Sequence, residues 1–162
     1  LEQGAAIKFW GGIPGTTQPA GIWLDQFFTL SKKYNLSNEE YAYTQMVLAQ
    51  TLSDAFMECW KAKYIYWTKR PDMELKTIET AMPNPPFPSY VSGHSVISFA
   101  AATVLAKFFP EDGENYLRNA EEAKNSRLWA GIHFPHDNEE GKKLGIKVGE
   151  FVAKKLEVKA IR

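Results

Sequence analysis

The chain contains three short clusters of cationic, hydroxyl and imidazole side chains that together suit a negatively charged tetrahedral group. The clusters consist of Lys63 and Arg70, of Ser92, Gly93 and His94, and of Arg127, His133 and Asp137. Lysine supplies a compact positive charge, whereas arginine offers a planar pair of donors that matches two oxygens of an oxyanion. A histidine can attack such a centre or transfer a proton to its leaving oxygen. The pattern therefore indicates an enzyme that acts at an oxyanion.

The run from Ser92 to His94 follows a proline-rich stretch and is expected to begin a helix. The first amides of a helix lack intrahelical acceptors and lie at the positive end of its dipole, so that an anion can bind there. Gly93 would let the backbone approach the anion closely, and Ser92 would add a hydroxyl donor. The alternatives are that Ser92 only caps the helix and that His94 is an ordinary surface or core side chain.

The cationic side chains can meet at one site only if the backbone brings them together. Lys63 and Arg70 are seven positions apart, about two helical turns, and share a face if one helix includes both. The alternative is a solvated basic face. Arg127 and His133 are six positions apart, roughly 120° out of line in an unbroken helix. Their convergence requires the length of the arginine side chain or a helix that loosens near Gly131.

Asp137 lies four positions after His133, and its carboxylate can accept a hydrogen bond from one imidazole nitrogen. That bond would fix the tautomer and leave the other nitrogen free to attack or to ligate. The alternative is that Asp137 is the N-cap of the last helix, and the two roles can coexist. A zinc site built from Cys59, His133, His136 and Asp137 is a weaker alternative, because spacing places no convincing third ligand.

The elements that must position these residues are helical. Trp23, Phe27, Leu30 and Tyr34 recur at helical spacing, and Ser37 with Glu40 forms a capping-box pattern. The prolines in residues 70–91 indicate that this stretch forms an ordered active-site loop or another irregular segment rather than a helix. We predict an all-α bundle of about five helices in a single domain over residues 1–162. The expected helices cover about residues 20–34, 37–67, 92–108, 112–132 and 137–158.

Composition narrows the classes of partner. Nineteen basic and nineteen acidic residues cancel, so no global field favours nucleic acid or an anionic membrane. The lone Cys59 excludes an intramolecular disulfide and is expected to be buried and structural. No apolar run is long enough for a membrane span, so we expect a soluble segment. The first residue is Leu1, so the chain could be the C-terminal part of a longer protein, or a periplasmic or secreted protein from which a signal peptide was removed. A homo-oligomer is a separate expectation.

The order and spacing of the three clusters resemble the signature of the type 2 phosphatidic-acid phosphatase and vanadium-dependent haloperoxidase superfamily. The resemblance implies a helical bundle, with His133 as the residue that attacks phosphorus or ligates the vanadium of vanadate. It implies that His94 is the acid–base partner and that Asp137 orients His133. The residues that it implies for binding phosphate or vanadate are Lys63, Arg70, Ser92, Gly93 and Arg127.

Two details resemble the haloperoxidase branch, and its chloroperoxidase-like group in particular. Trp60 precedes the anion lysine by three positions, and residues 85–94 resemble that group's lead-in to its acid–base histidine. The resemblance implies that Trp60 and Phe87 flank a halide pocket; the alternative is that both are plain core aromatics. The chain is much shorter than typical haloperoxidases.

The expected function is therefore that of a haloperoxidase-like enzyme, which oxidises halide with hydrogen peroxide at a histidine-bound vanadate. One alternative is an acid phosphatase, acting on a phosphomonoester or a lipid phosphate through a phosphohistidine and needing no cofactor. Another is a non-catalytic phosphate-binding fragment. In the first two cases the partners are small: halide and peroxide, or a phosphate ester.

Overall fold

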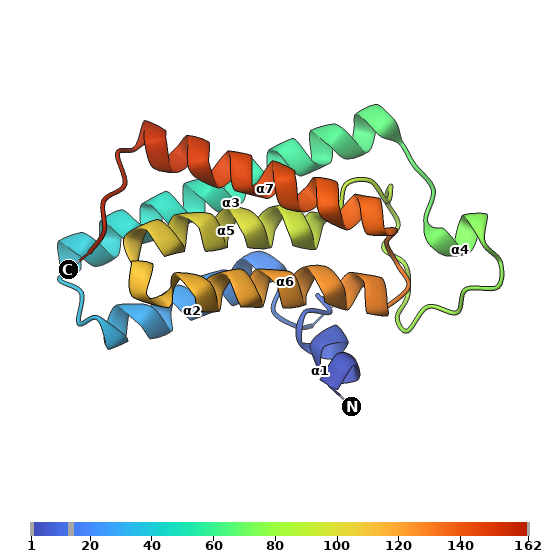
Figure 1. Ribbon diagram of the computed structural model, residues 1–162, viewed down its shortest axis with the longest axis horizontal. Coiled ribbons are helices and arrows are strands. Elements are labelled where there is room, and N and C mark those ends of the chain that lie inside the picture. Colours follow the sequence, from blue (N-terminus) through green and yellow to red (C-terminus); the bar gives the residue numbers. More distant parts are fainter. Residues whose placement is uncertain (1, 13–14, 162) are drawn as a thin grey trace.

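The computed structural model describes residues 2–12 and 15–161, and the regular secondary structure in these residues is helical throughout (Figure 1). The predicted all-α bundle is confirmed. Five helices match the predicted ones, and the short helices α1 and α4 were not expected. The elements are α1 (Glu2–Phe9), α2 (Pro19–Lys33), α3 (Asn38–Tyr66), α4 (Pro71–Glu74), α5 (Gly93–Phe108), the 3-10 turn η1 (Pro110–Asp112), α6 (Gly113–Trp129) and α7 (Pro135–Lys155).

Local chemistry fixes both ends of α3, the longest helix. The predicted capping box is present: the Ser37 hydroxyl accepts from the Glu40 amide at 3.3 Å, and the Glu40 carboxylate accepts from the Ser37 amide at 2.9 Å. The helix ends after Tyr66, where Trp67 takes a left-handed conformation with φ of 46°. Neither α3 nor another helix in the described residues is long and apolar enough to cross a bilayer.

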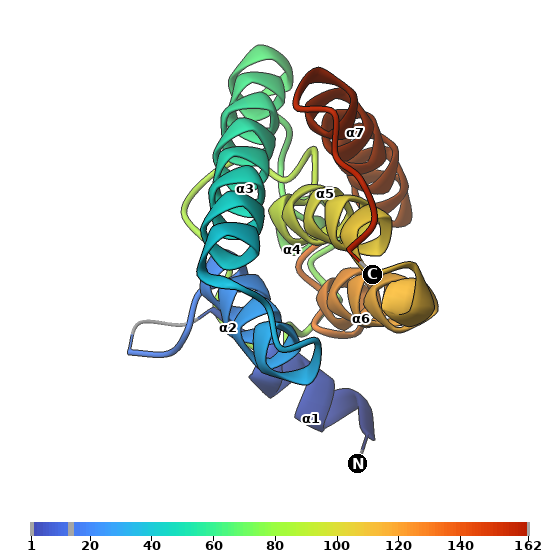
Figure 2. The same ribbon diagram turned by 90° about the vertical axis from the view of Figure 1, so that its left-hand side faces the viewer.

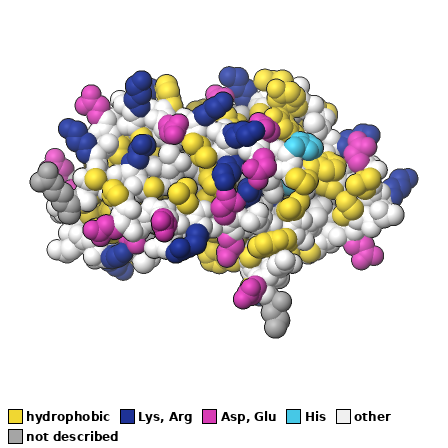
Figure 3. All heavy atoms as spheres, in the orientation of Figure 1, with side chains coloured by type: hydrophobic (Ala, Val, Ile, Leu, Met, Phe, Trp, Pro, Cys, Tyr) yellow, Lys and Arg dark blue, Asp and Glu magenta, His cyan; other side chains and the backbone are white. Residues whose placement is uncertain are grey.

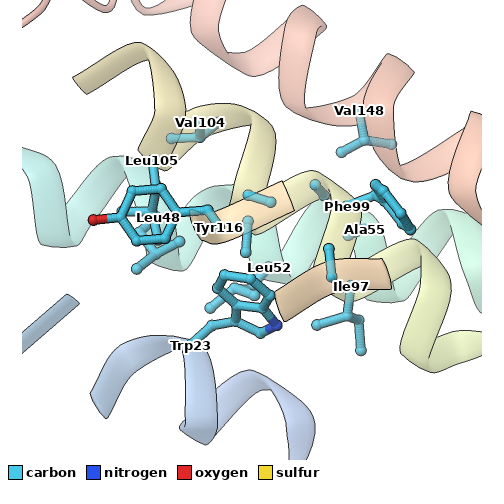
Figure 4. Packing of buried hydrophobic residues seen from close by; sticks show 14 of the residues in the cluster. Trp23, Leu48, Leu52, Ala55, Ile97, Phe99, Val104, Leu105, Tyr116 and Val148 are labelled. Carbon is cyan, nitrogen blue, oxygen red and sulfur yellow. The ribbon is translucent and has the colours of Figure 1, made fainter. Parts of the chain in front are cut away.

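Helix α5 is the centre of the bundle, surrounded by α3, α6 and α7 (Figure 2). It is apolar around its circumference, as expected of a helix with neighbours on every side. Its Phe99 and Leu105 pack with Trp23 of α2, Leu48 of α3 and side chains of α6 and α7 in one continuous core (Figure 4). A rigid central helix gives the residues at its first turn a fixed position.

Three glycines on one face of α7 allow this helix to pack unusually close to α5. They are Gly141, Gly145 and Gly149. A Cβ atom at Gly145 would lie 2.4 Å from the carbonyl oxygen of Val96, so no larger side chain fits there without displacement. The close packing joins the first turns of the two helices, where the Ser92 amide donates to the Asp137 carbonyl at 3.0 Å. Two predicted functional clusters are thereby brought together.

Candidate active site

The predicted site residues gather at the end of the bundle where α3 and α6 end and where α5 and α7 begin, at the right in Figure 1. The proline-rich segment between α4 and α5 closes this end. Lys63 lies in the last turn of α3, Ser92 directly precedes α5, and His133 lies two residues before α7. Each of these three side chains is at least 95% buried, with exposed fractions of 1, 0 and 5%. Their polar groups must therefore be paired within the protein or with a ligand.

Lys63 is a buried cation, and the alternative of a solvated basic face is wrong for this residue. Its Nζ donates to the carbonyl oxygens of Pro88 at 2.7 Å and of Ser89 at 3.0 Å. Burial lowers the pKa of Lys63 to about 8, and the positive charge of Arg70 acts in the same direction. The neighbouring Lys61, in contrast, is exposed at the surface.

Arg70 reaches the site from outside the helix that contains Lys63. Because α3 ends at Tyr66, Lys63 and Arg70 do not share a helical face; Arg70 is the residue that precedes α4. The two cations meet instead at Phe87, whose ring centroid is 5.2 Å from Lys63 Nζ and 5.2 Å from Arg70 Cζ. The aromatic ring of the proline-rich segment thus separates and positions the two charges.

Arg70 also defines the tautomer of His133. Its Nη1 donates to the Ile132 carbonyl at 2.8 Å and lies 3.0 Å from His133 Nε2. A guanidinium group has only donors, so Nε2 must be the acceptor and the ring proton must be on Nδ1. Burial lowers the pKa of His133 to about 3, so the ring is neutral. The lone pair of the His133 ring is therefore on Nε2, and Nη2 of Arg70 is buried without a partner.

A carboxylate and a hydroxyl hold the other side of the His133 ring. Nδ1 donates to Asp137 Oδ2 at 3.1 Å, and Ser89 Oγ donates to the same oxygen at 2.6 Å. The Ser89 hydroxyl is also 3.3 Å from His133 Nδ1. Burial alone would raise the pKa of Asp137, but the hydrogen bonds from His133 and Ser89 outweigh it and lower the pKa. Asp137 is therefore an ionised anchor for a neutral imidazole.

Ser89 was not predicted as a site residue. It is fully buried, and both its hydroxyl and its carbonyl bind site residues. Its position in the sequence, within the segment just before Ser92, was the only available signal. That signal is weak, because a loop serine acquires this role only when the segment folds back onto α7.

Asp137 is not the N-cap of the last helix, which begins at Pro135 rather than at residue 137. Proline suits the first helical position because it lacks an amide proton. Asp137 is the third residue, and its Oδ2 accepts from the Phe134 amide at 3.0 Å, so it both supports the helix start and binds His133. Its Oδ1 lies 3.2 Å from the exposed His136 ring, in a contact without hydrogen-bond geometry.

The start of α5 presents donors to the same region. Ser92 does not cap the helix with its side chain, contrary to the simplest alternative, and its Oγ is buried without a partner. The first amides of α5, beginning with that of Gly93, also lack intrahelical acceptors. A Cβ atom at Gly93 would make only an ordinary contact of 3.7 Å with the sulfur of Cys59. Protein packing therefore does not by itself require glycine at this position.

His94 and Arg127 both form hydrogen bonds with backbone carbonyls of the N-terminal segment. His94 Nε2 donates to the Trp10 carbonyl at 2.6 Å, which leaves Nδ1 as the lone-pair nitrogen. Arg127 Nη2 donates to the Ile7 carbonyl at 3.1 Å. Burial lowers the pKa of His94 well below its usual value, and the nearby positive charges of Arg127 and Lys63 lower it further.

Helix α6 ends at Trp129 rather than at residue 132, and Gly131 turns the chain with φ of +71°. The early end of α6 is the loosening near Gly131 that Arg127 and His133 need in order to reach one site. Arg127 remains in the last turn of α6, fully buried, with Nε donating to Ser126 Oγ at 3.0 Å. His133 follows the turn and approaches Arg70 instead. The two residues thus approach the site from different directions.

Trp60 and Phe87 are in contact, with ring centroids 4.9 Å apart, and both are half-buried. Phe87 adjoins the cations, and Trp60 packs behind it.

Cys59 is buried as predicted. The zinc alternative has no structural support, since residues 2–12 and 15–161 contain no group of three or more His, Cys, Asp or Glu side chains arranged to hold a metal.

Buried cations thus lie around a neutral, oriented histidine at one end of a helical bundle. The chain belongs to the PAP2 superfamily, whose family model matches residues 42–158. This range includes every site residue described above except the N-terminal carbonyl groups. Membership of this family supports the prediction that the protein is an enzyme.

The solved structures that are similar to this one include the following two. A bacterial vanadium-dependent iodoperoxidase is 26% identical, with a TM-score of 0.89 over 99% of this chain and 45% of its own. A transmembrane PAP2-type phosphatidylglycerolphosphate phosphatase from Bacillus subtilis is 14% identical, with a TM-score of 0.60 over 96% of this chain and 85% of its own. The second likeness concerns the fold alone. The chain spans less than half the length of the iodoperoxidase, and no curated protein matches it.

Proposed function

We propose that the site binds vanadate and oxidises halide with hydrogen peroxide, as a haloperoxidase-like enzyme. The observation that carries the proposal is a pair of buried, unpartnered donors, Arg70 Nη2 and Ser92 Oγ, in the cluster that contains His133. Buried polar groups without partners are rare in folded proteins, so this pair fits an oxyanion that would supply the missing acceptors. A neutral imidazole at His133 supplies the ligand atom, Nε2.

The residues present fit vanadate by charge as well as by hydrogen bonding. Lys63, Arg70 and Arg127 are cations, and Ser92 and the first amides of α5 are neutral donors. Preorganised positive charge in a buried site stabilises an oxyanion far more than the same charge does in water. When bound, vanadate would supply a Lewis-acidic centre that activates peroxide for two-electron oxidation of halide.

His94 is proposed to accept and return a proton through Nδ1. Its Nε2–H is engaged by the Trp10 carbonyl, so Nδ1 is the nitrogen that can exchange protons. The lowered pKa of His94 keeps the ring neutral, which suits a base that takes a proton from hydrogen peroxide. The overall reaction consumes one proton, because peroxide and halide yield hypohalous acid and water.

Two observations support the halide-oxidising branch over the phosphatase branch. Likeness to the iodoperoxidase extends over nearly the whole chain, at higher identity than likeness to the phosphatase. In addition, Phe87 packs on Trp60 beside the two cations, as expected for the proposed halide pocket. An apolar ring next to positive charge suits a large, weakly hydrated anion such as iodide.

The test is a pair of assays on the same purified protein, with and without added vanadate. We expect vanadate-dependent oxidation of iodide, and of bromide more slowly, when peroxide is present. His133→Ala should lower the rate by at least about 100-fold, as removal of one essential group usually does. The exposed neighbour His136→Ala is the matched control. No peroxide-dependent oxidation by vanadate-loaded protein would contradict the proposal.

A phosphatase is the second candidate, because a neutral His133 with its lone pair on Nε2 is also a suitable nucleophile for phosphorus once Arg70 Nη1 turns to the substrate oxyanion. In that case Nε2 forms a bond to phosphorus, the ester oxygen leaves with a proton, and water later releases phosphate. Hydrolysis of 4-nitrophenyl phosphate that vanadate inhibits and His133→Ala abolishes would favour this candidate. Saturable phosphate binding without either activity would favour a non-catalytic fragment.

A further inference from the structure

Helix α3 carries a second row of apolar and small side chains, on the side that faces away from the bundle. The row begins with six residues separated by alternating steps of four and three positions: Ala42, Met46, Ala49, Ser53, Phe56 and Trp60. It continues through Tyr64 to Trp67, the residue that follows the helix. Steps of four and three place side chains in one line along a helix, as is typical of a helix that packs on another helix.

This row is open to solvent in the structure. Trp60 is half-buried and the other members of the row are exposed, by 51% at Phe56 and 65% at Trp67. Helices α2, α5 and α7 pack on other sides of α3, which lies at the edge of the bundle in Figure 2. Hydrophobic side chains are visible on the surface around the end of α3 (Figure 3). The row is therefore an apolar helix face without a partner in the described residues.

The aromatic rings in the second half of the row are already packed on one another. Phe56 contacts Trp60, Trp60 contacts Tyr64, and Tyr64 contacts Trp67, in each case with ring centroids 5.6 Å apart. Side chains that are ordered before association lose little conformational freedom when a partner covers them. Trp60 also contacts Phe87, so the row extends to the ring beside the two site cations.

The row is large enough to support an association. Covering one aromatic side chain buries about 150–250 Å², so the exposed parts of the row amount to roughly 700 Å². The largest apolar patch on a typical monomer is about 300–600 Å², whereas a standard interface buries about 800 Å² on each partner. Nineteen basic and nineteen acidic residues cancel, so two copies of the chain do not repel each other through net charge.

We propose that this row is the interface of a homodimer in which the α3 helices of two copies pack antiparallel, with the two-fold axis at Ser53. The aromatic side chains all lie after Ser53 and the two alanines lie before it. An antiparallel pair therefore places Ala42 opposite Tyr64 of the partner subunit, and Ala49 opposite Phe56 of the partner subunit. Large side chains then meet small ones, as close packing requires. A parallel pair would set aromatic on aromatic and alanine on alanine.

The same arrangement connects the interface to the oxyanion site. Met46 of the partner subunit would lie on Trp60, and a methionine thioether packs favourably against an aromatic ring. Because Trp60 packs on Phe87, the dimer would restrain the aromatic side of the site.

Sedimentation equilibrium of the full chain tests the proposal. We expect a monomer–dimer equilibrium with a micromolar Kd, as befits an interface of slightly less than standard size. Ser53→Lys places two like charges at the two-fold axis and should weaken the dimer by at least about 100-fold. Leu117→Lys, at an exposed position of α6, is the matched control and should associate as the wild type does. Circular dichroism checks that each variant is folded.

A pair of charge substitutions tests the antiparallel orientation. Ala42→Glu and Tyr64→Lys should each weaken the dimer by at least about tenfold. In the double variant the introduced carboxylate of one copy meets the introduced ammonium group of the other, so the loss should be smaller than the product of the two single losses. In a parallel dimer the two losses would multiply.

Three results would overturn the proposal: a monomer throughout the micromolar range, a dimer that Ser53→Lys leaves intact, or single losses that multiply in the double variant. A monomer that binds phosphatidylcholine vesicles, and loses this binding in Ser53→Lys, would assign the row to a membrane surface instead.

Discussion

Ser89 donates a hydrogen bond of 2.6 Å to Asp137, on the carboxylate oxygen that also accepts from His133. One oxygen thus receives the serine hydroxyl, the imidazole Nδ1–H and the Phe134 amide. Three donors hold the carboxylate in place and lower its proton affinity. The serine therefore fixes the orientation of His133 through Asp137, although it does not have to touch the oxyanion.

We predict that Ser89→Ala lowers activity by about 10- to 100-fold, the usual range for loss of a residue that orients a ligand. With one donor fewer, Asp137 becomes a stronger acceptor, so the pKa of His133 should rise. Histidine NMR titration measures that shift, and a role limited to packing would leave it unchanged. Ser98→Ala is the matched control, since this buried hydroxyl accepts from Trp23 Nε1 at 3.0 Å in the core.

From the burial of Lys63 we predict that the affinity of the site for anions depends on pH. Its pKa is lowered to about 8, so the free protein loses this positive charge as the pH rises above that value. Tungstate is a suitable probe because it remains a dianion over this range. Its Kd should be constant below about pH 8 and should rise about tenfold per pH unit above it. Lys63→Met should bind tungstate weakly at every pH, and a pH dependence that persists in this variant would assign the effect to another group.

His133 should remain neutral, with its proton on Nδ1, in the anion-free protein down to about pH 5. Its pKa is about 3 in the folded chain, against about 6.5 in an unfolded one. The unfolded state therefore binds more protons between these values, and the free energy of unfolding should fall as the pH is lowered from 6.5 towards 3. Nitrogen chemical shifts of the ring report the tautomer and the charge. A ring that titrates near pH 6.5 would contradict the buried, neutral state.

The close packing of α5 and α7 predicts a large effect of a small substitution. Gly145→Ala should destabilise the fold by about 1–3 kcal/mol, since the added Cβ would meet the Val96 carbonyl. Gly4→Ala is the control, because a Cβ there has no neighbour within 4 Å and alanine favours a helix. Urea unfolding measures both values. Equal stabilities of the two variants would indicate that α7 does not depend on this approach.

The sequence was sufficient to predict the class of fold and most of the residues that the structure brings together at the candidate site. Helical periodicity, the capping box at Ser37 and the prolines predicted five helices close to their observed positions. Motif order predicted which residues would gather around His133. These features are local or depend on spacing, so they can be read without a tertiary structure.

The remaining features depend on contacts between distant segments. Helix α3 ends at Tyr66, close to its predicted end, so Arg70 lies outside the helix of Lys63, and helical spacing alone cannot reveal how Arg70 then reaches the site. Ser89 binds Asp137 across 48 positions of sequence. The N-terminal carbonyl groups that bind His94 and Arg127 are backbone atoms and carry no sequence signal.

Vanadate binding by wild-type and His133→Ala protein tests the central claim most directly. Equilibrium dialysis or vanadium NMR on the full chain measures it without reliance on turnover. We expect one saturable site in the wild type, at least about 100-fold weaker binding in His133→Ala, and wild-type binding in His136→Ala. Equally tight binding by His133→Ala would contradict it.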